Sequence, residues 1–301
     1  MSNLPVKDNF IIAVDGGGSK CQVRLFNGKT ADYIAEYTGG SCNFASDFDQ
    51  AITNLVQSIE KLLLKADLAE NVIAQCTVAG GFAGVNLPKV CKKLSNWPHP
   101  FQNFLFTTDL HLACYAANQS CNGKAIITGT GSCAIATNIN TEVVLGGYGF
   151  QIGDQASGAW LGRQAIEQTL LVLDNLTPHN QLSTLITEHA NSTDATQLSQ
   201  QWYQASPNQF AELAPLVTGL AQENDPCALA IVNTALLYLA QLIEQLNKVQ
   251  SSPTYLLGGL ASFYYPRLKE QYDVRLSEHQ PIAGAMVLID NPQLSLNETY
   301  V

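Results

Sequence analysis

The most chemically suggestive stretch of the sequence is an acid followed by three glycines. Asp15 precedes Gly16, Gly17 and Gly18, between two apolar runs that predict a tight strand hairpin with positive φ available at its turn. Bare glycine N–H groups can cradle a phosphate. A carboxylate repels that phosphate unless a cation lies between them, a place that suits Mg²⁺. The pattern predicts either a phosphate and magnesium site or a plain glycine-rich hairpin.

A second glycine turn with the same layout follows further along the chain. Apolar residues 125–127 lead into Gly129-Thr130-Gly131-Ser132, and another apolar run comes next. Two copies of one strand–turn–strand motif indicate a duplicated pair of domains. We expect the two turns to face each other across a cleft.

Asp109 is the sharpest candidate for a catalytic group. It follows the predicted strand 104–108 and precedes the predicted helix 110–117. A carboxylate at a strand end beside a cleft can accept a proton from a hydroxyl group as a general base. The same position suits a helix N-cap, which accepts hydrogen bonds from free N–H groups. The sequence leaves both roles open.

Two polar loops supply further candidates. Asp154, Gln155 and Ser157 lie in the glycine-rich loop 146–158 and form a donor and acceptor set that suits a polyhydroxylated ligand. Capping of the next helix is the alternative role for Asp154. Asn43, in another polar loop, is a weaker indication.

Polar and glycine residues recur where predicted strands end. These positions are Asp15, Gly80, Asp109, Thr130 and Gly258. Because ligands of open α/β sheets bind outside the carboxyl ends of strands, we expect the five positions to converge.

Other nucleotide and hydrolase motifs are not expected. Gly28-Lys29-Thr30 imitates the end of a P-loop, but Val23 stands where its first glycine must be. The five histidines are scattered and suggest no Ser/His/Asp triad. Cys133 lies in an apolar strand and is expected to pack.

Hydrophobic periodicity places these residues on alternating strands and helices. The first half reads strand, strand, strand, helix, strand, helix, strand, helix, and the same order restarts at residue 124. The predicted elements after the first hairpin are a strand at 32–37, a helix from 46, strands at 73–79 and 104–108, and a helix at 110–117. In the second half they are a strand at 142–145, a helix at 160–174, a helix capped by Asp225-Pro226, a strand before the glycine pair at 258–259, a strand at 273–276 and a helix at 282–289.

The amino-acid composition limits the classes of protein to which the chain can belong. With 301 residues, 46% apolar and 13% charged, the chain is long and apolar enough for two compact domains. A net charge of −10 argues against a nucleic-acid or membrane-surface partner, which requires a basic face. The first residues lack a signal-peptide pattern and no apolar run approaches a membrane span, so a cytoplasmic protein is expected. The eight cysteines form no C-x-x-C pair and are expected to be reduced and buried.

These motifs together resemble a known family. The segments 15–20 and 129–132 are similar to the two phosphate motifs of the superfamily of sugar kinases and actin-like ATPases. More narrowly, the chain resembles the BadF/BadG/BcrA/BcrD ATPase family, in its branch of N-acetylglucosamine kinases and bacterial glucosamine kinases. The segments that carry this resemblance are 146–149, 153–163, 214–217, Asp225-Pro226 and 257–259.

The resemblance implies an α/β fold of two ribonuclease-H-like lobes, each a mixed sheet flanked by helices. The first lobe would comprise 1–117, with a last helix at 282–301 packing back on it. The second would comprise 118–281, with a helical insertion at about 175–223.

The resemblance also implies an ATP-dependent kinase that phosphorylates the 6-hydroxyl of N-acetylglucosamine or glucosamine. ATP and Mg²⁺ would be required, with Asp109 as the base and Asp15 anchoring the metal. The implied acceptor-binding residues are Asn43, Asp109, Ser132, Gly147 and Asp154. The implied ATP-binding residues are Gly16, Gly17, Gly18, Ser19, Lys20, Thr130, Gly131, Gly258 and Gly259.

Several alternatives stay open. Cys133 and Asp154-Gln155 match the pattern of the bacterial glucosamine kinases, and Tyr148 replaces a common Trp. The resemblance therefore leaves both glucosamine and N-acetylglucosamine open as the acceptor sugar. Two other function classes are an activase, which would hydrolyse ATP to drive electrons through an iron–sulfur cluster shared by two subunits, and a sugar sensor without turnover. The expected partners are small molecules only, and a homodimer is left open.

Overall fold

The computed structural model describes residues 10–138 and 141–297 of the chain. Contacts divide them into two compact units. The split unit comprises the described residues of Met1–Gly123 and Ser277–Val301, and the continuous unit comprises those of Lys124–Leu276. This division assigns residues 118–123 and 277–281 to the split unit, whereas the sequence analysis expected them in the second lobe.

The split unit contains a mixed sheet in the order β3-β2-β1-β4-β5. Its strands are β1 (Phe10–Gly16), β2 (Cys21–Asn27), β3 (Tyr33–Gly39), β4 (Cys76–Phe82) and β5 (Asn103–Thr108). The first three strands are antiparallel, while β4 and β5 run parallel to β1. The predicted strand at 73–79 begins only at Cys76, because residues Glu70–Gln75 form a 3₁₀ helix.

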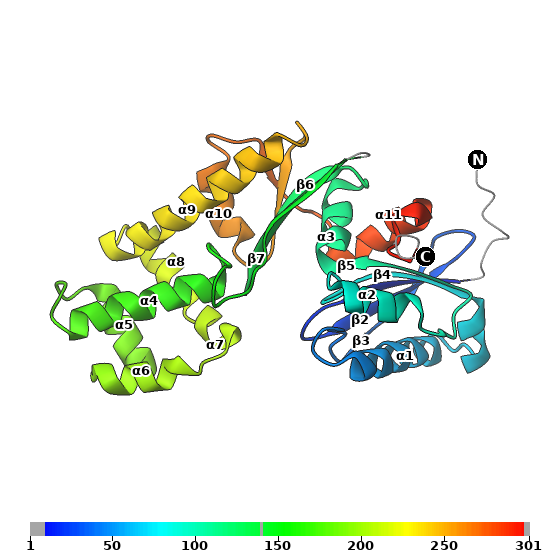
Figure 1. The fold of residues 1–301 in the computed structure, drawn as a ribbon, viewed down its shortest axis with the longest axis horizontal. Helices are drawn as coiled ribbons and strands as arrows, with labels where there is room; N and C mark the ends of the chain where they lie inside the picture. Colours follow the sequence, from blue (N-terminus) through cyan, green and yellow to red (C-terminus); the bar gives the residue numbers. More distant parts are fainter. Residues whose placement is uncertain (1–9, 139–140, 298–301) are drawn as a thin grey trace. The chain divides into compact units, whose positions relative to one another are not determined.

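Helices cover both faces of this sheet (Figure 1). Side chains of a strand alternate between faces, so Ile12 joins the cluster formed with α1 (Phe48–Lys65) and α2 (Pro88–Ser95). Ala13 points the other way, toward α3 (Asp109–Asn118) and α11 (Gly284–Asp290). The two faces of β1, the strand that ends at Asp15 and Gly16, are therefore each covered by a layer of helices.

The end of the chain completes the split unit. A 3₁₀ turn at Pro281–Ala283 leads into α11, and a further turn follows at Pro292–Leu294. The segment after it lies along β5: the N–H of Phe106 donates to Ser295 Oγ at 3.0 Å, and the N–H of Leu296 donates to the Phe106 carbonyl at 2.9 Å. A single helix over 282–301 was expected, and this is wrong for 291–297, because Pro292 cannot continue the hydrogen-bond ladder of α11. Residues 298–301 lie outside the described residues.

The continuous unit repeats the same sheet, in the order β10-β9-β6-β7-β8. Its strands are β6 (Gly123–Thr128), β7 (Ser132–Thr137), β8 (Glu142–Gly146), β9 (Thr254–Leu257) and β10 (Val274–Leu276). In both sheets the first strand lies between the second and the fourth, with the third and fifth at the edges. The predicted restart of the strand order at residue 124 is confirmed, and so is the α/β class.

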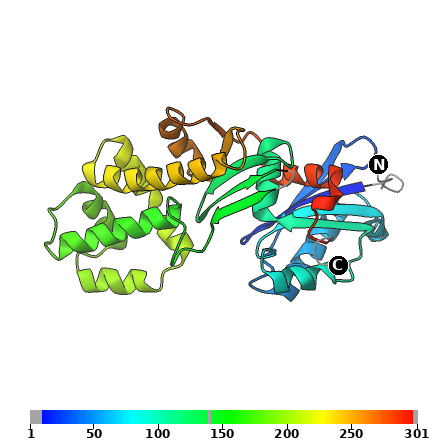
Figure 2. The same ribbon diagram turned by 45° about the horizontal axis from the view of Figure 1, so that its top comes forward.

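The connection from β8 to β9 carries the helical part of the continuous unit. Its helices are α4 (Gly158–Leu173), α5 (Gln181–Ala190), α6 (Ala195–Tyr203), α7 (Pro207–Ala211), α8 (Ala214–Gln222) and α9 (Pro226–Asn247), and α10 (Ala261–Leu268) follows β9. The expected insertion at about 175–223 corresponds to α5 to α8, which gather beyond the strands of their own sheet in Figures 1 and 2. Asp225 caps α9 as predicted, accepting the N–H of Ala228 at 2.8 Å.

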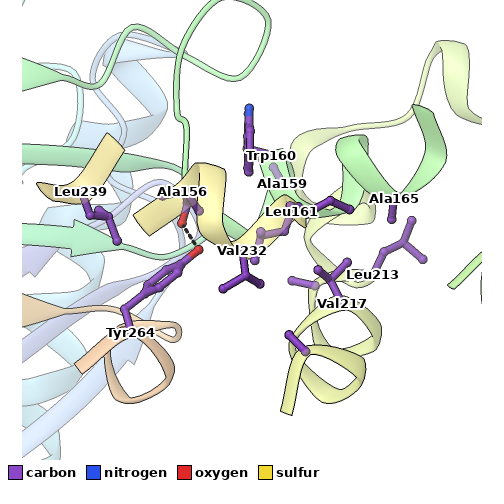
Figure 3. Packing of buried hydrophobic residues seen from close by; sticks show 14 of the residues in the cluster. Ala156, Ala159, Trp160, Leu161, Ala165, Leu213, Val217, Val232, Leu239 and Tyr264 are labelled. Atoms are coloured by element: carbon purple, nitrogen blue, oxygen red, sulfur yellow. Dashed lines mark hydrogen bonds between the residues drawn. The ribbon is translucent and has the colours of Figure 1, made fainter. Parts of the chain in front are cut away.

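The core of the continuous unit holds the loop that precedes α4. Leu161, Val232 and Leu239 are fully buried there (Figure 3). Tyr264 of α10, also 0% exposed, donates its hydroxyl to the carbonyl of Ala156 at 3.0 Å. This hydrogen bond fastens an irregular loop to an apolar core.

Helix α9 is the one described helix that is long and apolar enough to cross a bilayer, contrary to the expectation that no apolar run approaches that length. Eight of its side chains are buried in the core of the continuous unit, including the apolar stripe of Ile231, Ala235, Leu239, Leu242, Ile243 and Leu246. Its apolar character is therefore accounted for by packing within the protein.

Candidate functional site

The glycine turn after Asp15 is a tight hairpin connection. Gly16 pairs with Cys21, and the N–H of Gly17 donates to the carbonyl of Lys20 at 2.9 Å. None of Gly16, Gly17 and Gly18 has a positive φ, so the expected use of left-handed backbone is wrong. Space explains the glycine at position 16 instead, since a Cβ there would lie 2.3 Å from the Phe82 ring.

Asp15 and Asp109 lie on neighbouring parts of the same sheet edge. Asp15 is opposite Gly81 of β4, and Gly81 is opposite Thr107 of β5. Gly81 leaves room for this arrangement, because a Cβ there would lie 3.1 Å from Asp109 Cα and 2.7 Å from the Thr108 carbonyl. The sheet therefore brings two acids together across a glycine.

Asp15 and Asp109 bring two carboxylates into one partly desolvated place, and this raises the pKa of each. Burial, and then the charge of Asp109, raise the pKa of Asp15 to about 6, while Lys20 and Arg24 oppose the rise. Burial also raises the pKa of Asp109. Two partly desolvated carboxylates with raised pKa values are a donor set that a divalent cation would neutralise.

The N-cap alternative for Asp109 is wrong. Thr108 caps α3, since its hydroxyl oxygen accepts the N–H of His111 at 3.2 Å. Asp109 occupies the first turn of the helix, where one carboxylate oxygen accepts the N–H of Leu110 at 2.9 Å. The Asp109 side chain keeps contact with solvent, while neighbouring protein atoms desolvate its carboxylate enough to raise its pKa.

Asn43 lies beside the same glycine turn. Its side-chain oxygen accepts the N–H groups of Ala45 and Ser46, which fixes the loop and the direction of the amide. A Cβ at Gly18 would lie 3.9 Å from Asn43 Nδ2. The structure thus brings Asn43 together with the tip of the hairpin, where Ser19 is exposed.

The second glycine turn is anchored by the start of α4. The N–H of Gly158 donates to the Gly129 carbonyl at 2.8 Å, and the N–H of Ala159 donates to the Thr130 carbonyl at 3.2 Å. Ser157 caps the helix by accepting the N–H of Trp160. The capping alternative for Asp154 is therefore wrong as well.

Ser132, Gly147 and Asp154 lie close together, and their shared binding role stays a prediction. The N–H of Gly147 donates to the Ser132 carbonyl at 3.0 Å. Asp154 is 8% exposed, and its carboxylate lies beside Gly131, where a Cβ would be 2.8 Å from Oδ2. Burial raises the pKa of Asp154 against the opposing N–H groups of Ser132 and Gly149.

Gly258 and Gly259 lie next to the same turn. Gly258 has a φ of +93°, and a Cβ there would lie 2.4 Å from the Thr128 carbonyl, at the end of β6. The N–H of Leu260 donates to that same carbonyl at 3.0 Å. Gly259 is exposed with no atom within 4 Å of a Cβ position, so its backbone is open to a ligand.

The predicted positions therefore form one group in each unit. Asp15, Gly80 and Asp109 share the edge of the first sheet, while Thr130 and Gly258 share the edge of the second. Convergence of all five stays a prediction.

Sequence reasoning missed two tyrosines at the second group. Tyr264 holds the loop through Ala156, and Tyr238 of α9 reaches the end of β8. Tyr238 interrupts a run of leucine and alanine residues at 235–240, and this was the only available signal for it.

No dedicated metal-binding cluster accompanies these groups. Among the residues that the structure describes, no three His, Cys, Asp or Glu side chains gather in an arrangement that could hold a metal ion. Of the eight cysteines, five are buried and three are partly buried. The Asp15 and Asp109 carboxylates remain compatible with Mg²⁺, which proteins often hold through one or two carboxylates plus substrate phosphates.

Comparisons with known proteins agree over nearly the whole chain. The sequence pattern of the BadF/BadG/BcrA/BcrD ATPase family matches residues 12–288. The glucosamine kinase GspK of Vibrio cholerae is 26% identical over 291 residues, covering 96% of this chain and 98% of that protein. The N-acetyl-D-glucosamine kinase of Dictyostelium discoideum is 25% identical, covering 93% of this chain and 97% of that protein.

A solved structure extends the agreement to the fold. A protein from Chromobacterium violaceum, provisionally designated an N-acetylglucosamine kinase, aligns with a TM-score of 0.84 at 25% identity. The alignment covers 94% of this chain and 100% of that chain. The pair of mixed five-stranded sheets is thus the two-lobed fold that the sequence predicted.

Proposed function

The chain belongs to the BadF/BadG/BcrA/BcrD ATPase family, and we propose that it is an amino-sugar kinase that transfers the γ-phosphoryl group of ATP to the 6-hydroxyl of glucosamine or N-acetylglucosamine. The observation that carries the proposal is the pair Asp15 and Asp109, set across Gly81 beside a bare glycine turn. Relatives named as kinases of both sugars support the same reaction.

In this proposal Asp109 accepts the proton of the 6-hydroxyl as its oxygen attacks the γ-phosphorus. The bond from that phosphorus to the bridging oxygen breaks, and ADP leaves. Positioning and charge neutralisation supply most of the catalysis in phosphoryl transfer, so the base is one contributor among several. Asn43, Ser132, Gly147 and Asp154 would hold the remaining groups of the sugar.

The glycine turns would hold the nucleotide. Backbone N–H groups of Gly16, Gly17 and Gly18 would contact phosphate oxygens in the split unit, with Ser19 and Lys20 beside them. Thr130 and Gly131 would do so in the continuous unit. Gly258 and Gly259 would leave room for the adenosine.

Asp15 would hold Mg²⁺ through water. When bound, the ion would neutralise phosphate charge during transfer. A cytoplasmic location, with ATP and a monosaccharide as partners, belongs to the same proposal.

A coupled ADP-release assay tests this function. The acceptors are glucosamine, N-acetylglucosamine, glucose and N-acetylmannosamine, with MgATP in excess and the Asp109→Asn variant as the control for contaminating kinases. We expect ADP release with at least one of the first two sugars. ADP release that is independent of any sugar would contradict the proposal and point to an ATPase.

A further inference from the structure

A side chain outside the proposed acceptor-binding set reaches the same cluster in the continuous unit. Tyr238 lies on α9, and a Cβ added at Gly146 would lie 3.0 Å from its hydroxyl oxygen. Gly146 ends β8 and pairs with Cys133 of β7. Tyr238 therefore reaches the strand ends that carry Ser132 and Gly147.

The groups around the Tyr238 hydroxyl are an acid, a phenol and a thiol. Burial raises the pKa of Tyr238, and the charges of Asp154, Tyr148 and Cys133 raise it further. None of these three neighbours is basic, and the Asp154 carboxylate is the charge that favours a positively charged ligand group.

The backbone around this cluster depends on glycine. Gly146, Gly147 and Gly149 all have left-handed φ values, which glycine adopts without strain. A Cβ at Gly147 would lie 3.2 Å from the Cβ of Cys133, so the loop packs closely on β7 there. No side chain of the loop therefore stands between Gly146 and Gly147 and the polar groups of the cluster.

We propose that Tyr238 is an acceptor-binding residue that receives, together with Asp154, the 2-amino group of the sugar as a free ammonium. The inference rests on the proposed kinase function and adds the acceptor class, an amino sugar with an unsubstituted amine. An ammonium group donates three charge-assisted hydrogen bonds, which carboxylate and phenol oxygens can accept. An acetamido group donates one, carries no charge and adds a methyl group, so it gains less from this cluster.

Removal of one hydroxyl tests the proposal. Tyr238→Phe keeps the ring and its packing on α9, and its matched control is Tyr272→Phe, which removes a hydroxyl that donates to Glu244 of the same helix at 3.1 Å. Steady-state kinetics are measured with glucosamine and N-acetylglucosamine. Calorimetry without ATP gives the Kd of glucosamine independently of turnover.

We expect the wild type to favour glucosamine by about tenfold or more in kcat/KM, and Tyr238→Phe to lower that preference by about 10- to 100-fold, the range of a hydrogen bond to a charged group. The loss should appear in KM and in the calorimetric Kd, and Tyr272→Phe should change neither.

Three outcomes would overturn the inference: a wild-type preference for N-acetylglucosamine, an equal effect of Tyr238→Phe on both sugars, or no binding of glucosamine to the wild type. Glucosamine binding that depends on Tyr238 without any ADP release would support the subsite while contradicting the kinase function.

Discussion

In the proposed mechanism Asp109 accepts a hydroxyl proton, a role that one substitution can separate from nucleotide binding. Asp109→Asn keeps the shape of the side chain and the hydrogen bond from Leu110 but removes the basic oxygen. We expect kcat to fall by at least about 100-fold, within the usual contribution of a general base, while the Kd of ATP changes less than about threefold. Equilibrium ATP binding and steady-state turnover measure the two quantities. Retained turnover would refute the role as base.

Asp15 should carry a stability cost that depends on pH. Its pKa is raised from 3.8 to about 6 in the folded chain, so the folded state binds this proton more tightly than the unfolded state. Stability is therefore lost as the pH rises from about 3.8 to 6 and stays lost above that window. The full shift would correspond to about 3 kcal/mol, which we discount to about 1 kcal/mol because the side chain is partly exposed.

Asp15→Asn removes this cost. Without nucleotide or Mg²⁺, we expect the variant to be about 1 kcal/mol more stable than the wild type at pH 7.5 and to gain nothing near pH 4. Urea unfolding at both pH values measures the difference. Asp32→Asn, on an exposed loop, is the control and should gain at neither pH. A gain of equal size at pH 4 would exclude the ionisation of Asp15 as its cause.

At the scale of elements, Gly81 sets the distance between β4 and the start of α3. A Cβ at Gly81 would lie 2.5 Å from Leu112 Cβ and 2.7 Å from the Thr108 carbonyl, so the first turn of α3 must shift in Gly81→Ala. We expect a loss of about 1–3 kcal/mol in stability, as for an overpacked core. We also expect at least about a tenfold fall in kcat, because Asp109 moves with that turn.

Thermal unfolding and turnover measure both effects of Gly81→Ala. Gly219→Ala on α8 is the matched control: no atom lies within 4 Å of its Cβ position, and alanine in a helix interior should leave stability equal or slightly higher. A folded Gly81→Ala enzyme with normal kcat would show that this spacing does not position the base.

Much of the arrangement of elements could be predicted from the sequence, because local patterns specify it. The buried strand at residues 11–14 follows from a continuous apolar run, and the stripe of α9 follows from helical periodicity. The roles of Asp109 and Asp154 at helix starts could not be predicted, since either a carboxylate or the neighbouring Thr108 or Ser157 can cap a helix. The local hydrogen bonds from His111 to Thr108 and from Trp160 to Ser157 decide between them.

The conformation of the irregular loop before α4 was even harder to predict from local sequence patterns. Asp154 and Ala156 both adopt left-handed φ values, which are costly for residues other than glycine. Their conformation depends on partners far away in the chain, such as the Tyr264 hydroxyl at Ala156. No local pattern in residues 146–158 encodes those partners.

At the scale of the whole molecule, the nucleotide contacts that we propose come from residues of both units. Gly18 and Gly259 come one from each unit, and a Cβ meets no atom closer than 3.9 Å at Gly18 and none within 4 Å at Gly259. Valine at either position should therefore fold normally but obstruct a ligand that approaches the bare backbone. We expect each variant to raise the KM of ATP by about tenfold or more, a loss of about 1.4 kcal/mol in binding.

Melting temperatures and ATP titrations measure these two variants separately. An unchanged KM in Gly259→Val would remove the continuous unit from nucleotide binding. An unchanged KM in Gly18→Val would remove the first glycine turn.

The split unit is built from segments before and after the continuous unit, and this order has a consequence for synthesis on the ribosome. Leu112 on α3 is covered by Ala285 and Leu288, and β5 is joined by Ser295 and Leu296, which are all translated after the continuous unit. The continuous unit, whose residues all emerge earlier, can reach its native state first. A premature stop after Leu276 would leave the incomplete split unit with an apolar flank open to chaperones and proteases.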